Sequence, residues 1–146
     1  MFEAKNISVR IGAKKILDDV SLCFNAGETV ALVGTNGAGK STLLKAMCGD
    51  VKISGGEIVL ENRALEDWDY HALARKRAVL SQHSELNFPF TAREVALLGR
   101  NPHIRGTESK KDLEIVGEAL KLVEAEHLAD QSFPTLSGGE RQPVHL

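Results

Sequence analysis

The sequence has few cysteines, no long apolar run and almost no excess of charge, and each of these absences excludes a class of protein. Cys23 and Cys48 are the two cysteines, and neither has a C-x-x-C spacing, which excludes a disulfide scaffold and is typical of a reducing cytosol. No stretch approaches the roughly 18 consecutive apolar residues of a membrane-spanning helix. The formal net charge of -2 provides no basic surface for nucleic acid, which is therefore not an expected partner.

The remaining composition is that of an ordinary globular protein. Hydrophobic residues make up 42% of the chain and charged residues 26%. The 146 residues are enough for one compact core and at most two small lobes. Residues 1–6 do not form a basic region followed by an apolar run, so no secretory signal is expected.

The first 82 residues predict a mixture of strands and helices. Polar and apolar residues alternate in 6–11 and in 20–24, which indicates strands with one buried face. Residues 29–33 are apolar except for Thr29, which predicts a strand buried on both faces in a parallel sheet. The pattern also predicts short strands at 57–60 and 78–81, a polar helix at 69–77, and a helix at 40–48 that buries Leu43, Leu44 and Met47 and stops at Gly49.

The character of the sequence changes after Gln82, where helical patterns begin. Thr91 and Glu94 form a capping box that opens a helix to about Leu98. A second helix is predicted over 109–124, with one apolar stripe formed by Leu113, Val116, Leu120 and Val123. We therefore expect a core lobe at 1–82, a helical lobe at 83–136 and the start of a further helix at 137–146.

A glycine-rich loop follows the predicted buried strand and leads directly into a helix. It matches the pattern G-x-x-x-x-G-K-[ST], whose glycines let backbone N–H groups surround anionic oxygens. The helix adds its N-terminal dipole, Lys40 supplies a charge for the β- and γ-phosphates, and Ser41 offers a hydroxyl to Mg²⁺. The expected phosphate-binding residues are Gly34, Thr35, Asn36, Gly37, Ala38, Gly39, Lys40, Ser41 and Thr42.

A second motif, Leu-Ser-Gly-Gly-Glu at residues 136–140, lies well after this loop. Ser137 and Glu140 form another capping box, and Gly138 and Gly139 leave backbone N–H groups open to an anion. With the phosphate loop upstream, the pair of motifs resembles that of the ABC ATPase family, and the resemblance covers nearly the whole chain. It implies an α/β fold of the P-loop NTPase (ABC ATPase) class, a core lobe with a helical subdomain, incomplete at the C-terminus.

The resemblance also implies roles, partners and cofactors. ATP and Mg²⁺ are the expected cofactors, and Lys40 and Gln82 the expected catalytic residues; Gln82 and Ser41 would contact Mg²⁺. Ser137, Gly138 and Gly139 would contact ATP held by the other subunit of a homodimer, not by their own chain. The expected location is the cytoplasmic face of the inner membrane, as a peripheral protein bound to transmembrane permease subunits.

Three segments look like those of hemin-importer ATP-binding subunits, namely residues 75–83, 88–91 and 98–103. Siderophore and cobalamin importers share the general pattern and remain alternatives. A DNA-repair ABC ATPase is disfavoured because the stretch between Gln82 and Leu136 is short and has no coiled-coil insertion.

The sequence also departs from the family. No apolar run ends in Asp-Glu, no switch histidine follows one, and the sequence suggests a truncated chain or an incomplete gene model. Pro143 falls at the sixth position of the helix capped by Ser137, where it should cost on the order of 3 kcal/mol. Ile11 replaces the aromatic residue that many members stack on adenine. A non-catalytic nucleotide-binding fragment is therefore the alternative function for these residues.

Overall fold

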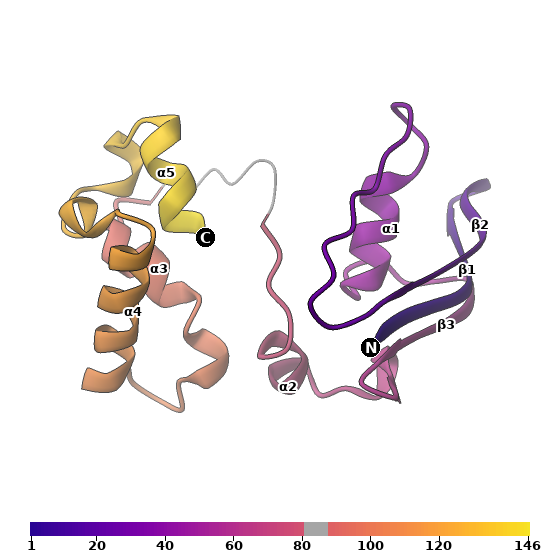
Figure 1. Cartoon of the computed structure of the whole chain (residues 1–146), viewed down its shortest axis with the longest axis horizontal. Helices are drawn as coiled ribbons and strands as arrows, with labels where there is room; N and C mark the ends of the chain where they lie inside the picture. Colours follow the sequence, from indigo (N-terminus) through magenta and orange to yellow (C-terminus); the bar gives the residue numbers. More distant parts are fainter. Residues whose placement is uncertain (81–87) are drawn as a thin grey trace. The chain divides into compact units, whose positions relative to one another are not determined.

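The computed structural model describes residues 1–80 and 88–146, which divide into two compact units. The first unit comprises Met1–Tyr70 and the second His71–Leu146 (Figure 1). Each unit has its own buried core, so each is described by itself. The predicted boundary between the core lobe and the helical lobe, at Gln82, lies outside the described residues and stays a prediction.

The first unit contains a four-stranded antiparallel sheet in the order β2-β1-β3-β4. The strands predicted at 6–11, 20–24 and 57–60 are confirmed, although each extends further towards the N-terminus. The bounds are β1 Phe2–Ile11, β2 Lys14–Phe24, β3 Gly55–Leu60 and β4 Arg63–Ala64, followed by the 3-10 turn η1 Leu65–Asp67. One face of the sheet forms the core through Ala4, Ile7, Val9, Leu17 and Ile58.

Paired irregularities bend β1 and β2 near their middle. Asn6 and Asp19 both have positive φ angles, 50° and 55°, and the Asn6 side-chain amide donates to Asp19 Oδ1 at 2.8 Å. Gly56 on β3 lies against this bend, because a Cβ there would come within 2.4 Å of the Asn6 carbonyl oxygen. Such bulges increase strand twist locally, and here they demand glycine on the neighbouring strand.

Helix α1, Lys40–Met47, packs beside β1 and β2 (Figure 1). It begins directly after the glycine-rich loop and ends at Cys48, with Gly49 at φ 77°, as the sequence predicts. Leu43, Ala46 and Met47 are buried, but the prediction that Leu44 is buried is wrong, since its side chain is 56% exposed. Leu44 is one position after Leu43 and therefore points to a different side of the helix.

The predicted buried strand at 29–33 is not a strand in the structure, and the same holds for 78–80. Val30, Leu32 and Val33 are 55%, 44% and 88% exposed. A strand buried on both faces needs hydrogen-bonding neighbours, and none of the strands in the described residues pairs with this segment. These apolar side chains are therefore exposed, and such surface favours association.

The second unit is built from short helices, and α3, α4 and α5 share one apolar core with the turns η3 and η4. The bounds are α2 Tyr70–Ala74, α3 Ala92–Leu98, α4 Lys110–Leu122 and α5 Gly138–His145, with the 3-10 turns η2 Asn101–His103, η3 Glu126–Leu128 and η4 Phe133–Thr135. α2 is shorter than the helix predicted at 69–77. The stripe prediction for α4 is confirmed for Val116 and Leu120, each 2% exposed, and wrong for Leu113, which is 40% exposed.

Within residues 1–80 and 88–146, three helices begin with a capping box. In each box the cap side chain accepts from a backbone N–H of the first turn, and a side chain of the first turn accepts from the cap backbone N–H. Those of Thr91 with Glu94 and of Ser137 with Glu140 confirm the prediction. A third, of Ser109 with Asp112, starts α4. Such caps satisfy backbone N–H groups that a helix start otherwise leaves unpaired.

Asp112 also holds the loop before α4 through Arg100, whose guanidinium lies 3.0 Å from Asp112 Oδ1. Hydrogen bonds from the Ser109 hydroxyl, from its backbone N–H and from Arg100 lower the pKa of Asp112 from its usual value to about 2. Asp112 is 8% exposed, so its carboxylate connects two parts of the second unit in a site largely shielded from water. Its charged form is favoured by folding, and the stability it gives is lost as the pH falls from about 4 towards 2.

Asp112→Asn is therefore expected to lower the melting temperature at pH 7 by roughly 4 °C, because the charged acceptor of four hydrogen bonds from Arg100 and Ser109 is lost. The difference from the parent should shrink between pH 4 and pH 2, where the parent carboxylate itself becomes protonated. Asp130→Asn is the control, since Asp130 pairs with Arg93 but its side chain is 86% exposed. Equal, pH-independent effects of the two substitutions would contradict the assignment.

Candidate functional site

The glycine-rich loop connects the unpaired segment 29–33 to helix α1. The Ala38 backbone N–H donates to the Thr35 carbonyl at 3.2 Å, which closes a tight turn. Gly37 and Gly39 have φ angles of 83° and 90°, a backbone conformation that residues other than glycine rarely adopt. Residues 34–38 are all exposed, so the concave side of the loop is accessible to a ligand.

Lys40 reaches back over this loop from the first position of α1. Its Nζ donates to the carbonyl oxygens of Gly34 at 2.7 Å and of Thr35 at 2.8 Å. The ammonium group thus lies at the start of the loop, where it can exchange these neutral acceptors for anionic oxygens. A charged acceptor makes the stronger hydrogen bond, so this position favours an anion.

The start of α1 offers further donors. The first N–H groups of a helix have no partner within it, and here the cap residue is Gly39, which provides no side-chain acceptor. The first turn contains no acidic residue that would compete for the helix dipole, and the Ser41 side chain is exposed. These residues fit a chain of phosphate oxygens, with Ser41 as a hydroxyl ligand for a hard cation such as Mg²⁺.

Gly39 is packed tightly against β2, a contact that sequence reasoning missed. A Cβ at Gly39 would lie 2.9 Å from Leu17 Cδ2 and 3.1 Å from the Ile16 carbonyl oxygen. Strand β2 therefore lies directly against the loop at the residue that precedes α1. Nothing in the local sequence of β2 marks Leu17 as the residue that meets Gly39, so the sequence alone contains no signal for this contact.

The second motif lies in the other unit. Ser137 caps α5, and its hydroxyl donates to Glu140 Oε2 at 2.6 Å. This hydroxyl and the Ser137 backbone N–H hold the pKa of Glu140 below its usual value. Gly138 and Gly139 are exposed, and a Cβ at either would meet nothing within 4 Å, so the approach to both backbones is open.

The structure thus brings Gly34–Thr42 together in the first unit, while Ser137–Gly139 start a helix of the second unit. Gln82, the predicted third component, lies outside the described residues. Pro143 is inside α5, and the helix continues through it to His145. The expected removal of one N–H therefore does not interrupt this helix.

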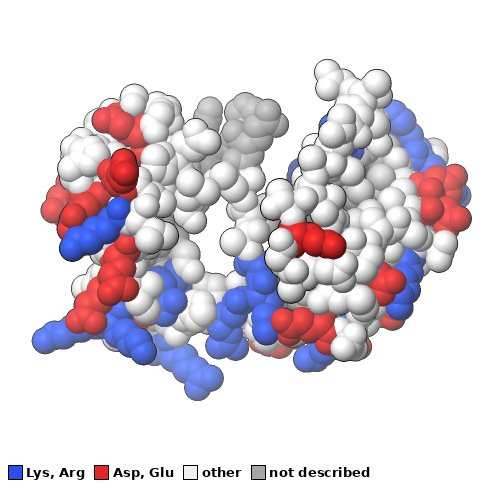
Figure 2. Space-filling model, in the orientation of Figure 1, with Lys and Arg blue, Asp and Glu red and all other residues white. Residues whose placement is uncertain are grey.

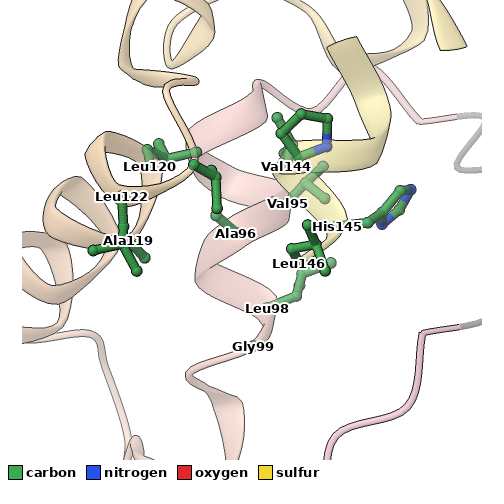
Figure 3. A pocket seen from close by; sticks show the side chains of 12 residues that line it. Val95, Ala96, Leu98, Gly99, Ala119, Leu120, Leu122, Val144, His145 and Leu146 are labelled. Carbon is green, nitrogen blue, oxygen red and sulfur yellow. The ribbon is translucent and has the colours of Figure 1, made fainter. Parts of the chain in front are cut away.

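The second unit also has an apolar groove of about 390 Å³ between α3, α4 and the end of α5 (Figure 3). Val95, Leu122 and Leu146 are among its lining residues. Over the visible face of the first unit, charges of both signs lie close together, without a large area of one sign (Figure 2). The groove is lined almost entirely by apolar residues, so it provides no charged site comparable to the loop around Lys40.

The family model described as ABC transporter matches residues 17–146. The chain belongs to the ABC transporter family. The family that the two motifs suggested from the sequence is therefore confirmed. The fold class that the resemblance implied is confirmed as well.

Curated relatives of this ABC transporter chain include proteins named hemin import ATP-binding protein HmuV. The one from Methylobacillus flagellatus is 44% identical over 100% of this chain and 54% of its own length. The one from Pseudomonas aeruginosa is 46% identical over 100% of this chain and 56% of its own length. The chain therefore spans about half the length of the curated relatives it matches.

Solved structures of ABC transporter cassettes share the fold. A nucleotide-free ATP-binding cassette is 27% identical, with a TM-score of 0.85, and is matched over 99% of this chain and 62% of its own. A dimeric cassette in a post-hydrolysis state, bound to ADP and Pi, is 30% identical, with a TM-score of 0.81 over 99% of this chain and 67% of its own. No helix in residues 1–80 and 88–146 has the length and apolar character to span a membrane.

Proposed function

We propose that this chain is the ATP-binding part of an ABC importer for hemin. The observation that carries the proposal is its 43–46% identity to hemin import ATP-binding proteins across the residues of both units. The loop around Lys40 supports nucleotide binding independently, because its ammonium group and the free start of α1 are arranged for an anion.

In this proposal the phosphates of Mg·ATP lie on residues 34–42. The Lys40 ammonium group would leave the Gly34 and Thr35 carbonyl oxygens and bind the β- and γ-phosphate oxygens. The Ser41 hydroxyl and the Gln82 side chain would contact the Mg²⁺ ion. Ser137, Gly138 and Gly139 meet ATP held by a second copy in a homodimer. The dimer works with transmembrane permease subunits at the cytoplasmic face of the inner membrane.

A second candidate function is nucleotide binding without hydrolysis. It applies to a polypeptide of these 146 residues by itself, because no apolar run among them ends in Asp-Glu, the pair that would support Mg²⁺ and polarise water. Both candidates require the phosphate loop, and they differ in turnover. Binding and turnover are therefore tested separately.

Lys40→Ala is expected to weaken ATP binding at least about tenfold, since it removes a charge-assisted contact of roughly 1.5–3 kcal/mol. The measurement is a titration with a fluorescent ATP analogue and Mg²⁺ at one salt concentration. Lys45→Ala is the control, because Lys45 is exposed in the last turn of the same helix. If both variants bind ATP as the parent does, phosphates are not held at this loop.

The same two variants test the transport role in cells. With the gene carrying Lys40→Ala, growth on hemin as the sole iron source should fail, while growth on inorganic iron and growth of the Lys45→Ala strain should persist. Normal growth on hemin, combined with failure on a siderophore or on cobalamin, would instead assign one of those substrates.

A further inference from the structure

Leu17 of β2 contacts the phosphate loop at Gly39. It is 5% exposed, is paired with Val9 of β1, and its Cδ2 would lie 2.9 Å from a Cβ at Gly39. Val9 is itself fully buried, with 0% exposure. Leu17 is therefore held between a rigid strand pair on one side and the glycine that starts α1 on the other.

The segment before the loop, residues 29–33, pairs with none of the strands in the described residues. Gly34, at the start of the loop, meets only Ala38 and Lys40 of the loop itself within 4 Å of an added Cβ. The contact of Gly39 with Leu17 and the Ile16 carbonyl thus joins the end of the loop directly to the sheet of the first unit.

We propose that Leu17 is a positioning residue for phosphate binding, acting through Gly39. Its side chain sets the place of Gly39, and Gly39 sets the direction of the first N–H groups of α1 and the origin of the Lys40 side chain. The proposal rests on the proposed function, because it concerns the same phosphate loop. Leu17 lies on the β2 side of Gly39, so it would affect ligand affinity only by placing the N–H groups of α1 and the Lys40 side chain.

If Leu17 had a purely structural role, we would expect a different result. Ile58 of β3 is equally buried, with 5% exposure, and is paired with Ala4 in the same sheet. If Leu17 only fills the core, its truncation and that of Ile58 have the same consequences. If Leu17 positions the loop, only its own truncation changes the affinity for phosphates.

The experiment compares five variants by competition of inorganic triphosphate against a fluorescent ATP analogue, with thermal melts recorded in parallel. Leu17→Ala and Leu17→Val both remove the contacting Cδ2 atom, and Leu17→Val keeps a β-branched residue suited to a strand, so it remains informative if Leu17→Ala unfolds. Leu17→Met retains the reach of the side chain. Ile58→Ala is the core control and Lys40→Ala the control for the phosphate site.

Leu17→Val and, where folded, Leu17→Ala should bind triphosphate roughly fivefold or more weakly, as expected when charge-assisted contacts are partly lost. Leu17→Met and Ile58→Ala should stay within about twofold of the parent. Parent-like binding by Leu17→Val, or an equal loss in Ile58→Ala, overturns the positioning role while leaving the site intact. Parent-like binding by Lys40→Ala overturns the phosphate site itself, and the positioning role with it.

Discussion

Gly39→Ala is expected to reduce ATP affinity by more than about tenfold, which is the largest effect we expect from a single methyl group. The backbone at Gly39 has φ 90° and ψ 5°, where a side chain strains the chain by roughly 1–3 kcal/mol. The added carbon would also lie 3.1 Å from the Ile16 carbonyl oxygen, a backbone atom that cannot rotate away. Relief requires Gly39 to shift, and the start of α1 moves with it.

Gly27→Ala is the matched control for this prediction. Gly27 has φ 80°, but an added Cβ would meet nothing within 4 Å, and the residue lies before the loop. It therefore suffers the backbone strain without the contact to β2. Both variants should melt at lower temperature than the parent, and only Gly39→Ala should lose ATP affinity in a fluorescence titration. Equal ATP affinities of the two variants would show that the contact with β2 does not matter.

Local signals in the sequence predict the parts of the fold that depend on neighbouring residues. The capping boxes of Thr91 and Ser137 need only a partner three positions away, and both form as predicted. The glycine loop likewise leads into α1 at Lys40. These features could be read without the rest of the structure because their hydrogen bonds close within one turn of chain.

Features that depend on distant partners were not predictable in the same way. Residues 29–33 have the composition of a buried strand, but a strand forms only where another one pairs with it. The contact of Gly39 with Leu17 depends on how α1 packs against β2, which no local pattern encodes. The candidate site could thus be located from the sequence, whereas what holds it in place could not.

A polypeptide of these 146 residues is expected to release no phosphate from Mg·ATP beyond the rate of its Lys40→Ala variant. Lys40 and Ser41 can place the phosphates, but positioning does not polarise the attacking water. The sequence contains no apolar run ending in Asp-Glu to provide the carboxylate.

Glu140 is the acidic residue of the second motif, and its carboxylate is already hydrogen-bonded to Ser137. Its Oε2 accepts from the Ser137 hydroxyl at 2.6 Å and from the Ser137 backbone N–H at 2.8 Å. These bonds hold its pKa below the usual value, which makes the carboxylate a weaker base. Glu140 is therefore a helix cap and a poor substitute for a catalytic carboxylate.

The measurement is phosphate release by the purified polypeptide at saturating Mg·ATP, with Lys40→Ala as the background and Glu140→Gln as a second variant. Lys40-dependent turnover near about one per second, within the ordinary range of enzymes, would contradict the prediction. Its loss in Glu140→Gln would then identify Glu140 as the base. Its persistence there would place the catalytic carboxylate elsewhere in the chain, because no other polypeptide is present to supply one.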